Sequence, residues 1–530
     1  MQRNKLRPPA VPLIVNDPYL SIWSMADTLT DQPTKHWTGK VQALSGLIAI
    51  DGQAYRFMGS KPNHFELNVP NMEQIDLQVL PTRTIYTFEA AGVRLELTFL
   101  TPLLPHNLEL MSRPVSYLDF SLSSTDQQSH KVQLYLDISP ALCVDHPMQE
   151  VVWGRHRIAG QEVLWMGSKD QAMLKRSGDD LRIEWGYLYA TPLETAGTSS
   201  VFASSLAAQT HFAKTGDLLD QDDTDMPKQP GNRPGAPVAA WLIEVGNVSE
   251  TPQAKAFLLA YDDYYSIEYF QRKLKPYWRK DGANAASLIR LAINDYKDIK
   301  ETCEAYDEEL TQDLKTAGGN VYVSLGSLAF RQCIAAHKLV VDGDGEALFF
   351  SKENYSNGCM GTVDITYPSS PFFLLFNPDL LKAQVTPILD YVRSGRWPFP
   401  FAPHDIGRYP IANGQFYGGG ENSEIDQMPV EECGNMLILV AALYKAKSDQ
   451  SFLERYWQIL SNWADYLLAK GLDPENQLCT DDFAGHMAHN VNLSLKALLG
   501  IAAYAQLCDA IGETQKAQEI RAQVQHMTKQ

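Results

Sequence analysis

Alternation of apolar and polar residues dominates the first half of the chain, from about residue 75 to residue 265. Many segments in this region alternate with period two and are rich in β-branched and aromatic residues, for example 83–90, 93–100, 115–122, 131–138 and 256–261. Gly, Pro, Asp and Ser bound these segments, as is typical of half-buried antiparallel strands. So many strands in succession predict a large β-sandwich.

The residues before this region, up to about residue 70, are rich in proline and tryptophan. They predict an extended arm that packs its rings against the rest of the protein without forming a core of its own. Within the arm, Asp51 and Gly52 lie between two apolar runs and are a hairpin signal. Later in the chain, the polar segment 218–237 is rich in Pro, Gly and Asp, which predicts an exposed loop.

The hydrophobic period changes near Ser266 to that of amphipathic helices. Residues 269–317 predict one or two linking helices, broken near Gly282. Beyond Gly318 and Gly319 the helical pattern continues, with helices expected at 324–341, 370–376, 380–394, 429–447, 451–470, 491–511 and 514–527. Long helices that alternate with polar loops predict helical hairpins arranged in a ring, an (α/α) toroid. A ring of six hairpins needs more helices than these seven, so we expect an incomplete ring.

The expected fold class is therefore multidomain β plus α. We expect an arm over 1–70, a sandwich resembling a supersandwich over 71–265, a helical linker over 266–319 and a catalytic toroid, truncated at its C-terminus, over 320–530. A chain of 530 residues fits about three domains of ordinary size.

Chemically useful side chains gather most densely between Arg396 and Asn435. Aromatic and proline residues alternate there with carboxylates and one histidine, and the glycines 418–420 separate two polar clusters. A loop of this length inside a compact domain is unusual unless it is functional. Aromatic rings supply apolar surface, glycines allow close approach of the backbone, and carboxylates with a histidine transfer protons. Together these residue types predict the wall of an active-site pocket. A solvated linker is the alternative, although linkers seldom carry so many large aromatic residues.

Polar clusters from separate stretches of the helical domain are candidates for one site, because loops at one end of a toroid meet near its centre. The candidate catalytic residues are His404, Asp405, Glu431 and Glu432. The candidate substrate-binding residues are Asn357, Asp364, Trp397, Arg408, Asn435, Asp481 and Asp482.

The adjacent carboxylates Glu431 and Glu432 open a predicted helix. Two carboxylates that face one bond act as acid and base when their surroundings separate their pKa values. Neighbouring helical side chains point about 100° apart. We therefore expect only one of the two to face the pocket, while the other caps the first helical turn. The sequence leaves the choice open, with Glu431 as the preferred base.

A metal site is an alternative for the last polar cluster, because Asp481, Asp482, His486 and His489 offer oxygen and nitrogen ligands. The two histidines are spaced to share one face of a helix. Without a matching third element, capping aspartates and hydrogen-bonded histidines are the preferred interpretation. We expect neither a metal nor a cofactor.

Two further groups of reactive residues have simpler interpretations. The seven cysteines are scattered singly, which predicts buried thiols and neither a disulfide framework nor a zinc site. Cys433 lies beside the acidic pair, but no His–Asn arrangement nearby supports a nucleophile. In the sandwich, Asp145 and His146 precede a proline, and a turn in a loop is the preferred interpretation.

Charge and motifs exclude several classes of function. A net charge of −18 argues against a nucleic-acid partner, and no run approaches 18 apolar residues, so no membrane span is expected. Neither a P-loop, a GxGxxG nor a GxSxG motif occurs. The start lacks the apolar core of a secretory signal. Localisation therefore stays open: the protein is cytoplasmic, or it is exported and its leader has been removed. A small-molecule substrate is expected, and the oligomeric state stays open.

Five segments in this order resemble the glutaminase A family: 8–24, 36–41, 354–371, 402–410 and 428–439. The resemblance covers almost the whole chain. It implies a hydrolase with an N-terminal β-sandwich and a C-terminal six-hairpin toroid that releases ammonia from L-glutamine. Members of the family normally carry an export signal and a longer helical domain, and this sequence departs from both.

Glutamine hydrolysis would use Glu431 or Glu432 to activate water, and His404 or a second acid to protonate the leaving ammonia. An Asn side chain or a backbone N–H would hold the oxyanion. Arg408 would bind the substrate carboxylate, and Asp405 or Asp364 its ammonium group. The alternative is a toroid-type glycoside hydrolase with paired carboxylates. A non-catalytic binding module is the third class.

Overall fold

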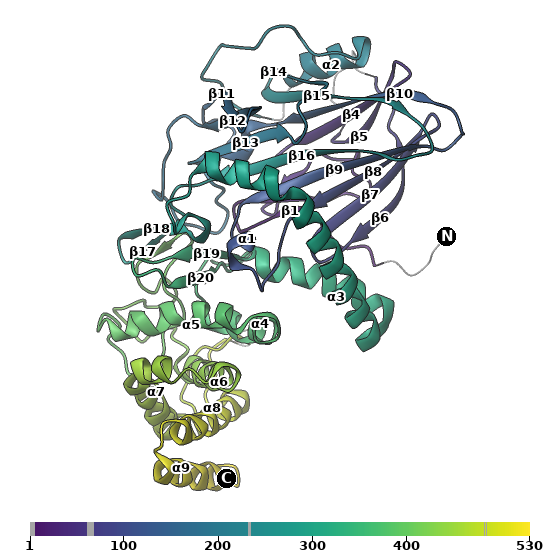
Figure 1. Cartoon of the computed structure of the whole chain (residues 1–530). Helices are drawn as coiled ribbons and strands as arrows, with labels where there is room; N and C mark the ends of the chain where they lie inside the picture. Colours follow the sequence, from purple (N-terminus) through teal and green to yellow (C-terminus); the bar gives the residue numbers. More distant parts are fainter. Residues whose placement is uncertain (1–5, 61–67, 232–234, 482, 484) are drawn as a thin grey trace. The chain divides into compact units, whose positions relative to one another are not determined.

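The computed structural model describes residues 6–60, 68–231, 235–481, 483 and 485–530. The chain forms two compact units, which are described separately. The first unit comprises residues 1–173, 181–264 and 278–335, and the second comprises 174–180, 265–277 and 336–530. Figure 1 shows that β-strands dominate the first unit and helices the second.

The first unit contains two large antiparallel sheets and a small one. The larger sheet has the order β11-β12-β13-β16-β9-β8-β7-β6, formed by β6 (Glu73–Val79), β7 (Arg83–Ala90), β8 (Val93–Leu100), β9 (Val115–Ser124), β11 (Val151–Ile158), β12 (Gln161–Ser168), β13 (Tyr187–Pro192) and β16 (Gln253–Asp262). The second sheet has the order β14-β15-β10-β4-β5, formed by β4 (Leu44–Ile50), β5 (Gln53–Met58), β10 (His130–Ile138), β14 (Thr198–Ser204) and β15 (Pro237–Val248). The small sheet contains β1 (Val11–Val15), β2 (Ser21–Ser24) and β3 (Lys35–His36).

Aromatic rings join the two large sheets face to face. The ring centroid of Phe57 on β5 lies 6.3 Å from that of Phe88 on β7 and 6.1 Å from that of Phe120 on β9. Trp241 on β15 and Phe257 on β16 are 6.1 Å apart. These contacts form the core of a β-sandwich, as the alternating pattern predicted.

Helices cover the outer face of each sheet. Phe212 of α2 (Ser205–Thr215) packs with Tyr135 on the outer side of the smaller sheet. Leu288 and Ile289 of α3 (Ala285–Ala335) pack with Tyr117 on the outer side of the larger one. Two short helices also belong to this unit, α1 (Leu108–Met111) and η1 (Pro140–Cys143), and η2 (Tyr277–Arg279) spans the point in the sequence where the second unit's segment 265–277 ends.

Local patterns located several elements of the sandwich accurately. The segments 83–90 and 93–100 coincide with β7 and β8. The predicted hairpin turn joins β4 to β5, with φ of 51° at Asp51 and 85° at Gly52. Positive φ at both central residues is the requirement of a tight hairpin turn, which Asp-Gly satisfies.

The expected helix over 269–281 is wrong, because this segment forms the hairpin of β17 (Ile267–Tyr269) and β18 (Arg272–Pro276), followed by η2. Its strands contain three and five residues, too short a window for the period to distinguish strand from helix. Positive φ at Phe270 and Gln271 makes the turn.

The helix expected to reach residue 341 ends instead at Ala335, and β19 (His337–Val341) and β20 (Ala347–Ser351) follow. Every residue of β19 is buried. An unbroken buried run carries no polar alternation, so its period does not identify it as a strand. In the second unit the strand order is β20-β19-β18-β17-β21, with β21 at Ile411–Ala412.

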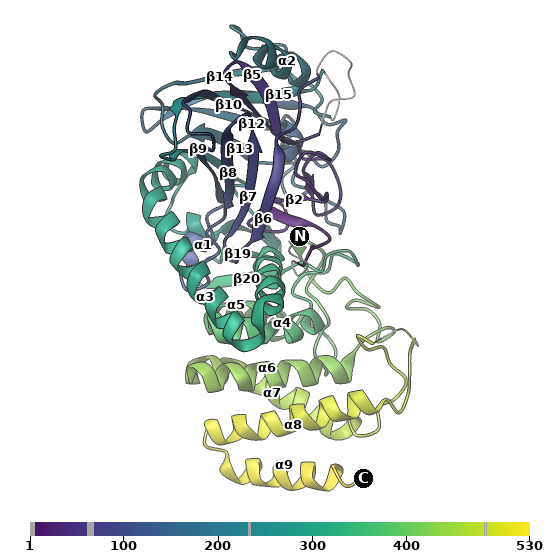
Figure 2. The ribbon, with the colours of Figure 1, turned by 90° about the vertical axis from the view of Figure 1, so that its right-hand side faces the viewer.

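The helices of the second unit are antiparallel hairpins, in agreement with the predicted toroid-type domain (Figure 2). They are α4 (Val363–Phe376), α5 (Pro378–Arg393), α6 (Pro429–Lys447), α7 (Gln450–Lys470), α8 (Val491–Ala510) and α9 (Thr514–Met527). Short connections join α4 to α5, α6 to α7 and α8 to α9. The longer loops 394–428 and 471–490 lead into α6 and α8. Polar loops therefore precede these two helix N-termini.

Close packing of α6 against α8 positions two side chains of the candidate site. A Cβ added to Gly500 of α8 would lie 2.9 Å from the Cα of Gly434 of α6, so the two backbones nearly touch. Because of this close approach, Lys496 on α8 reaches Asn435 on α6. By length and composition α8 could cross a membrane, yet half of its most apolar stretch is buried inside the protein.

Candidate active site

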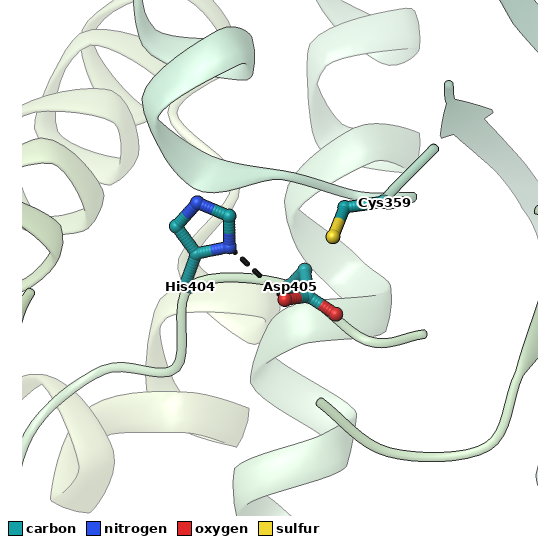
Figure 3. A group of neighbouring side chains, drawn as sticks. All are labelled: Cys359, His404 and Asp405. Atoms are coloured by element: carbon teal, nitrogen blue, oxygen red, sulfur yellow. Dashed lines mark hydrogen bonds and ion pairs between the residues drawn. The ribbon is translucent and has the colours of Figure 1, made fainter. Parts of the chain in front are cut away.

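Two loops pair along their backbones and form one wall of the candidate site. The N–H of Met360 donates to the carbonyl of Gly407 at 3.0 Å, and the N–H of Val363 donates to the carbonyl of His404 at 2.9 Å. Figure 3 shows that this pairing places Cys359 beside Asp405 and His404. The sequence clusters 354–364 and 402–410 therefore belong to one site.

Asp405 is the structural hub of this wall. Its carboxylate is fully buried and accepts backbone N–H groups from Gly407 at 2.9 Å, Phe416 at 2.8 Å and Tyr417 at 3.0 Å. Its Oδ2 also lies 3.0 Å from Nδ1 of His404 (Figure 3). Four partners occupy the acceptor positions of this carboxylate. Asp405 thus orients His404 and is not free to bind an ammonium group.

Two carboxylates surround His404 and favour its cationic form. Its ring stacks on Tyr417 with centroids 4.5 Å apart, and its Nε2 lies 3.6 Å from Oδ1 of Asp364. Burial lowers the pKa of His404, but the hydrogen bond to Asp405 and the charge of Asp364 outweigh burial and raise the pKa above its usual value. The site therefore favours the imidazolium form.

Asp364 lies in the first turn of α4, where the helix dipole favours a negative charge. Its Oδ2 accepts a hydrogen bond from the hydroxyl of Thr480 at 2.9 Å. Its Oδ1 is buried and has no hydrogen-bond partner among the described residues. It lies 3.6 Å from Nε2 of His404, which is an ion-pair distance but too long for a hydrogen bond, so this oxygen can still accept a donor from a ligand.

Both glutamates of the adjacent pair are buried, at 8% exposure for Glu431 and 0% for Glu432. Glu431 accepts the N–H of Thr480 at 2.8 Å and lies 3.0 Å from its hydroxyl. A carboxylate oxygen of Glu432 lies within 4.8 Å of donor atoms of both Asp364 and His404. The expectation that only one would face the site is therefore wrong. The site surrounds the first turn of α6, with Thr480 beside one carboxylate and His404 beside the other.

Glu432 has the environment of a proton donor. Its Oε2 accepts from Nδ2 of Asn435 at 3.0 Å, while its Oε1 has no partner within the described part of the chain. Burial raises the pKa of Glu432 well above its usual value, and the charges of Asp364 and Glu431 add to the effect. Asn435 and Lys496 oppose the shift without cancelling it. Glu432 therefore retains its proton at a pH where ordinary carboxyl groups are ionised.

Lys496 is a member of the site that sequence reasoning missed. Its Nζ donates to Oδ1 of Asn435 at 2.5 Å and lies 3.7 Å from the ring centroid of Tyr367. Burial lowers the pKa of Lys496, and the charges of Glu431 and Glu432 oppose that change. The sequence does contain a feature that points to Lys496, because it is the one charged residue between residues 491 and 508 of a predicted helix.

Two sets of side chains bring together donor atoms suitable for a metal, namely Asp364, His404 and Glu432, and Cys359, His404 and Asp405. The first set has one nitrogen and two oxygen donors, all within 4.8 Å of one another. Without a bound ion, burial and neighbouring charges raise the pKa of Glu432, so this carboxyl group would have to lose its proton to bind a metal. Burial also raises the pKa of the Cys359 thiol, which would likewise have to lose its proton to bind a metal. Acid–base chemistry suits these groups better.

Three other predicted residues stabilise the surroundings. Arg408 donates from Nε to the carbonyl of Asn357 at 2.7 Å, and its guanidinium lies 4.9 Å from the ring centroid of Phe416. Asn357 accepts the N–H of Cys359 at 2.7 Å. Trp397 is buried and donates to the carbonyl of Phe401 at 2.7 Å. Arg408 and Asn357 thus brace the paired loops, while Trp397 packs among rings.

The predicted cluster before α8 is dispersed. Asp481 is exposed, and Asp482 lies outside the described residues. His486 pairs with Asp426 at 3.1 Å, and His489 pairs with Asp473 at 2.6 Å. Both histidines precede Val491, the first residue of α8, so they do not share a helical face. The alternative metal site therefore has no common centre among its described members.

Family models cover most of the chain. A model of the glutaminase A six helical-hairpin domain matches residues 319–530. Models of two domains of unknown function match residues 82–313 and 1–70.

Solved structures match this chain only at low sequence identity and with TM-scores below 0.5. A bacterial glucoamylase complexed with acarbose is 10% identical, with a TM-score of 0.48 over 98% of this chain and 66% of that one. A putative kojibiose phosphorylase from the human microbiome is 10% identical, with a TM-score of 0.49 over 97% and 67%. This chain thus spans about two thirds of the length of both.

Curated relatives match along nearly the whole chain. Glutaminase A of Aspergillus oryzae is 32% identical over 520 residues, which are 96% of this chain and 73% of that protein. A probable glutaminase of Arthroderma benhamiae is 25% identical over 606 residues, covering 96% of this chain and 68% of that protein. By these relatives and the six helical-hairpin match, the chain belongs to the glutaminase A family.

Proposed function

We propose that this protein is a hydrolase that releases ammonia from the side-chain amide of L-glutamine, with Glu431 as general base and Glu432 as general acid. Family membership supports the substrate, because the relatives that match are named glutaminases. The different surroundings of the two adjacent carboxyl groups support the chemistry. This difference is the observation that carries the proposal.

Glu431 is the base because its Oε2 accepts the backbone N–H of Thr480 at 2.8 Å, while the Thr480 hydroxyl donates to Asp364 and leaves Oε1 of Glu431 free to accept a proton from water. Glu432 is the acid because its pKa is raised by burial and by neighbouring carboxylates. A proton donor beside a carboxyl group that can accept a proton from water is the arrangement that acid–base hydrolysis requires.

The reaction balances with these two groups alone. Glu431 takes a proton from water as the water oxygen attacks the amide carbon of the substrate. Glu432 then gives its proton to the amide nitrogen, the C–N bond breaks, and ammonia leaves with glutamate as the other product. The proton that Glu431 took up passes to Glu432 through solvent, which restores both groups for the next turnover. The imidazolium of His404, oriented by Asp405, stabilises the negative charge that develops on the carbonyl oxygen.

The two charged ends of glutamine need partners as well. Asp364 is the partner for the substrate ammonium, since its buried Oδ1 accepts no hydrogen bond from the described residues and Nε2 of His404 is 3.6 Å away from it. Asp405, the other acid considered for this role, is fully engaged by its four partners. Arg408 is the partner for the substrate carboxylate, because only its Nε is hydrogen-bonded among the described groups.

Ammonia release from L-glutamine by the purified chain tests the proposal. Glu431→Gln and Glu432→Gln should each lower kcat by about 100-fold or more, the usual contribution of a general acid or base. Glu454→Gln, an exposed glutamate on α7, is the matched control and should keep full activity. Turnover by both site variants within about tenfold of the parent would contradict the assignment.

A glycoside hydrolase is the second candidate, because a protonated and an ionised carboxyl group also cleave glycosidic bonds. A panel of aryl glycosides separates the two reactions. If the protein cleaves a glycoside and does not hydrolyse L-glutamine, its substrate is a glycoside and not an amide. The roles of the two glutamates as acid and base would then stay the same. Saturable ligand binding without turnover of either class would identify a binding module.

A further inference from the structure

A short segment from the middle of the sandwich sequence belongs to the helical unit. Residues 174–180 lie between β12 and β13 along the chain, yet they form part of the second unit together with the loops of the candidate site. The segment reads Leu-Lys-Arg-Ser-Gly-Asp-Asp. The roles assigned to the carboxyl groups of the site do not use it, so its contacts with the site loops call for a separate explanation.

Backbone contacts fasten this segment to both loops of the site wall. The N–H of Gly178 donates to the carbonyl of Tyr409 at 3.0 Å, and the N–H of Tyr409 donates to the carbonyl of Gly358 at 2.9 Å. A Cβ added to Gly358 would lie 2.7 Å from the backbone nitrogen of Asp179, so the two backbones are in direct contact. The segment therefore lies against both loops at the point where they pair.

A buried ion pair joins Asp179 to the start of the first loop. Nζ of Lys352 lies 2.6 Å from Oδ1 of Asp179, and the Lys352 side chain is fully buried. The same Nζ donates to Oδ1 of Asn354 at 3.1 Å. Burial lowers the pKa of Lys352, and the hydrogen bond and charge of Asp179 oppose that change. Because removal of one partner from a buried pair leaves the other charge uncompensated, Asp179 stabilises the ammonium group of Lys352 in this position.

Arg408 takes its position from the loop that Asp179 holds. Asp179 contacts the loop near both ends, at Lys352 and at Gly358. Between these two points, the carbonyl of Asn357 accepts a hydrogen bond from Nε of Arg408 at 2.7 Å. Like burial, the charge of Arg408 lowers the pKa of Lys352, so the two cations influence each other. Asp179 therefore supports Arg408 by fixing the loop and by compensating the neighbouring positive charge.

We propose that Asp179 is a positioning residue of the glutaminase site, which through the loop 352–358 holds Arg408 where its guanidinium group meets the substrate carboxylate. The inference rests on the proposed function, in which Arg408 is the partner of that carboxylate. It adds a determinant of specificity, because a guanidinium group held in place binds a carboxylate by directed, charge-assisted hydrogen bonds. An amide without the carboxylate gains nothing from this arrangement.

Two amides that differ in the carboxylate test this role. L-Glutamine carries it, whereas γ-aminobutyramide has the same amide and ammonium groups without it. For Asp179→Asn, which keeps the shape and removes the charge, KM for L-glutamine should rise about tenfold or more, the loss expected when one charge-assisted hydrogen bond is displaced. The kcat for L-glutamine and kcat/KM for γ-aminobutyramide should stay within about twofold of the parent, because a lost binding contact leaves the chemical step intact. If γ-aminobutyramide binds without turnover, its inhibition constant replaces kcat/KM.

Asp449→Asn is the matched control. Asp449 also pairs with a lysine of the helical unit, since its Oδ2 lies 2.7 Å from Nζ of Lys382, and asparagine keeps its capping role at the start of α7. This variant should give the kinetic constants of the parent with both amides. If Asp179→Asn does not fold by circular dichroism, Asp179→Leu combined with Lys352→Met replaces the whole buried pair by apolar side chains and should show the same rise in KM.

Two results would overturn the inference while the parent remains active. The first is a KM for L-glutamine within about twofold of the parent value, and the second is an equal loss of kcat/KM for both amides, which would indicate a general structural role. Failure of the proposed function gives a different result, because the parent itself would then release ammonia from neither amide. In that case the role of Asp179 falls with the proposed function.

Discussion

Replacement of Lys496 by methionine should reduce hydrolysis without unfolding the protein. The Nζ of Lys496 donates to Asn435 at 2.5 Å, and Asn435 donates in turn to Glu432 at 3.0 Å. Lys496 therefore fixes the amide that contacts the proposed acid. Met fills a similar volume and keeps contact with the Tyr367 ring, but it has no charge and no donor.

The magnitude follows from the two effects of the change. A hydrogen bond from a charged group contributes about 1.5–3 kcal/mol. Removal of a partly buried ammonium also removes its cost of desolvation, so the free energy of unfolding should change by less than about 1 kcal/mol. Without Lys496, Asn435 is no longer held in place and does not position Glu432 in the transition state. The value of kcat/KM should therefore fall about 10- to 100-fold.

The pH profile of kcat/KM separates the loss of the Lys496 charge from a general disturbance of the structure. The charge of Lys496 lowers the pKa of Glu432, so its removal raises that pKa further. Glu432 acts as an acid only while protonated, and the basic limb of kcat/KM against pH should therefore move to higher pH. Lys496→Arg keeps the charge and should leave the limb in place.

Lys516→Met is the matched control for this experiment. Lys516 donates to the hydroxyl of Tyr504 at 2.9 Å and also lies over an aromatic ring, but it is on α9 and outside the proposed site. Kinetics of ammonia release and calorimetric Tm are measured for all variants. If Lys496→Met behaves like Lys516→Met in both kcat/KM and the basic limb, the role assigned to Lys496 is refuted.

Three further predictions concern the same unit. Gly434→Ala would place a Cβ 2.6 Å from Cγ of Lys496, so overpacking should lower the free energy of unfolding by about 1–3 kcal/mol in urea titrations, and an unchanged value would contradict the close helix packing. Asp405→Asn removes the main group that raises the pKa of His404, so an NMR titration should give a lower pKa for that imidazole, and an equal or higher value would exclude the orienting contact. Folding raises the pKa of His404 from 6.5, so the contribution of this group to the free energy of unfolding is complete below pH 6.5 and is lost as pH rises through the folded pKa. His404→Gln should therefore flatten the decline of the free energy of unfolding with pH in urea titrations, and an identical decline would refute the linkage.

Much of the fold was predictable because local pattern and tertiary structure agree. The helices from α6 to α9 follow strong periodicity and begin within one residue of the predicted positions. The short strands β17 to β20 were missed for a physical reason, since their pairing, and not their own period, determines their structure. The run 337–341 is buried throughout, so its hydrophobic pattern is as compatible with a helix as with a strand.

The candidate site was predictable as a list of chemical groups but not as an arrangement. His404, Asp364, Glu431 and Glu432 come together as the sequence clusters suggested. The roles differ, because Asp405 is saturated by backbone N–H groups that no sequence pattern reveals. Contacts across helices, such as that of Lys496, depend on the packing of α6 and α8.

One measurement tests the central claim most directly, namely the rate of ammonia release from L-glutamine by the purified chain and by Glu432→Gln. The account predicts turnover by the parent and a loss of about 100-fold or more in the variant, with the fold retained by circular dichroism. Equal turnover by both proteins would contradict the acid role of Glu432. Absence of turnover by the parent, with cleavage of an aryl glycoside instead, would contradict the proposed substrate.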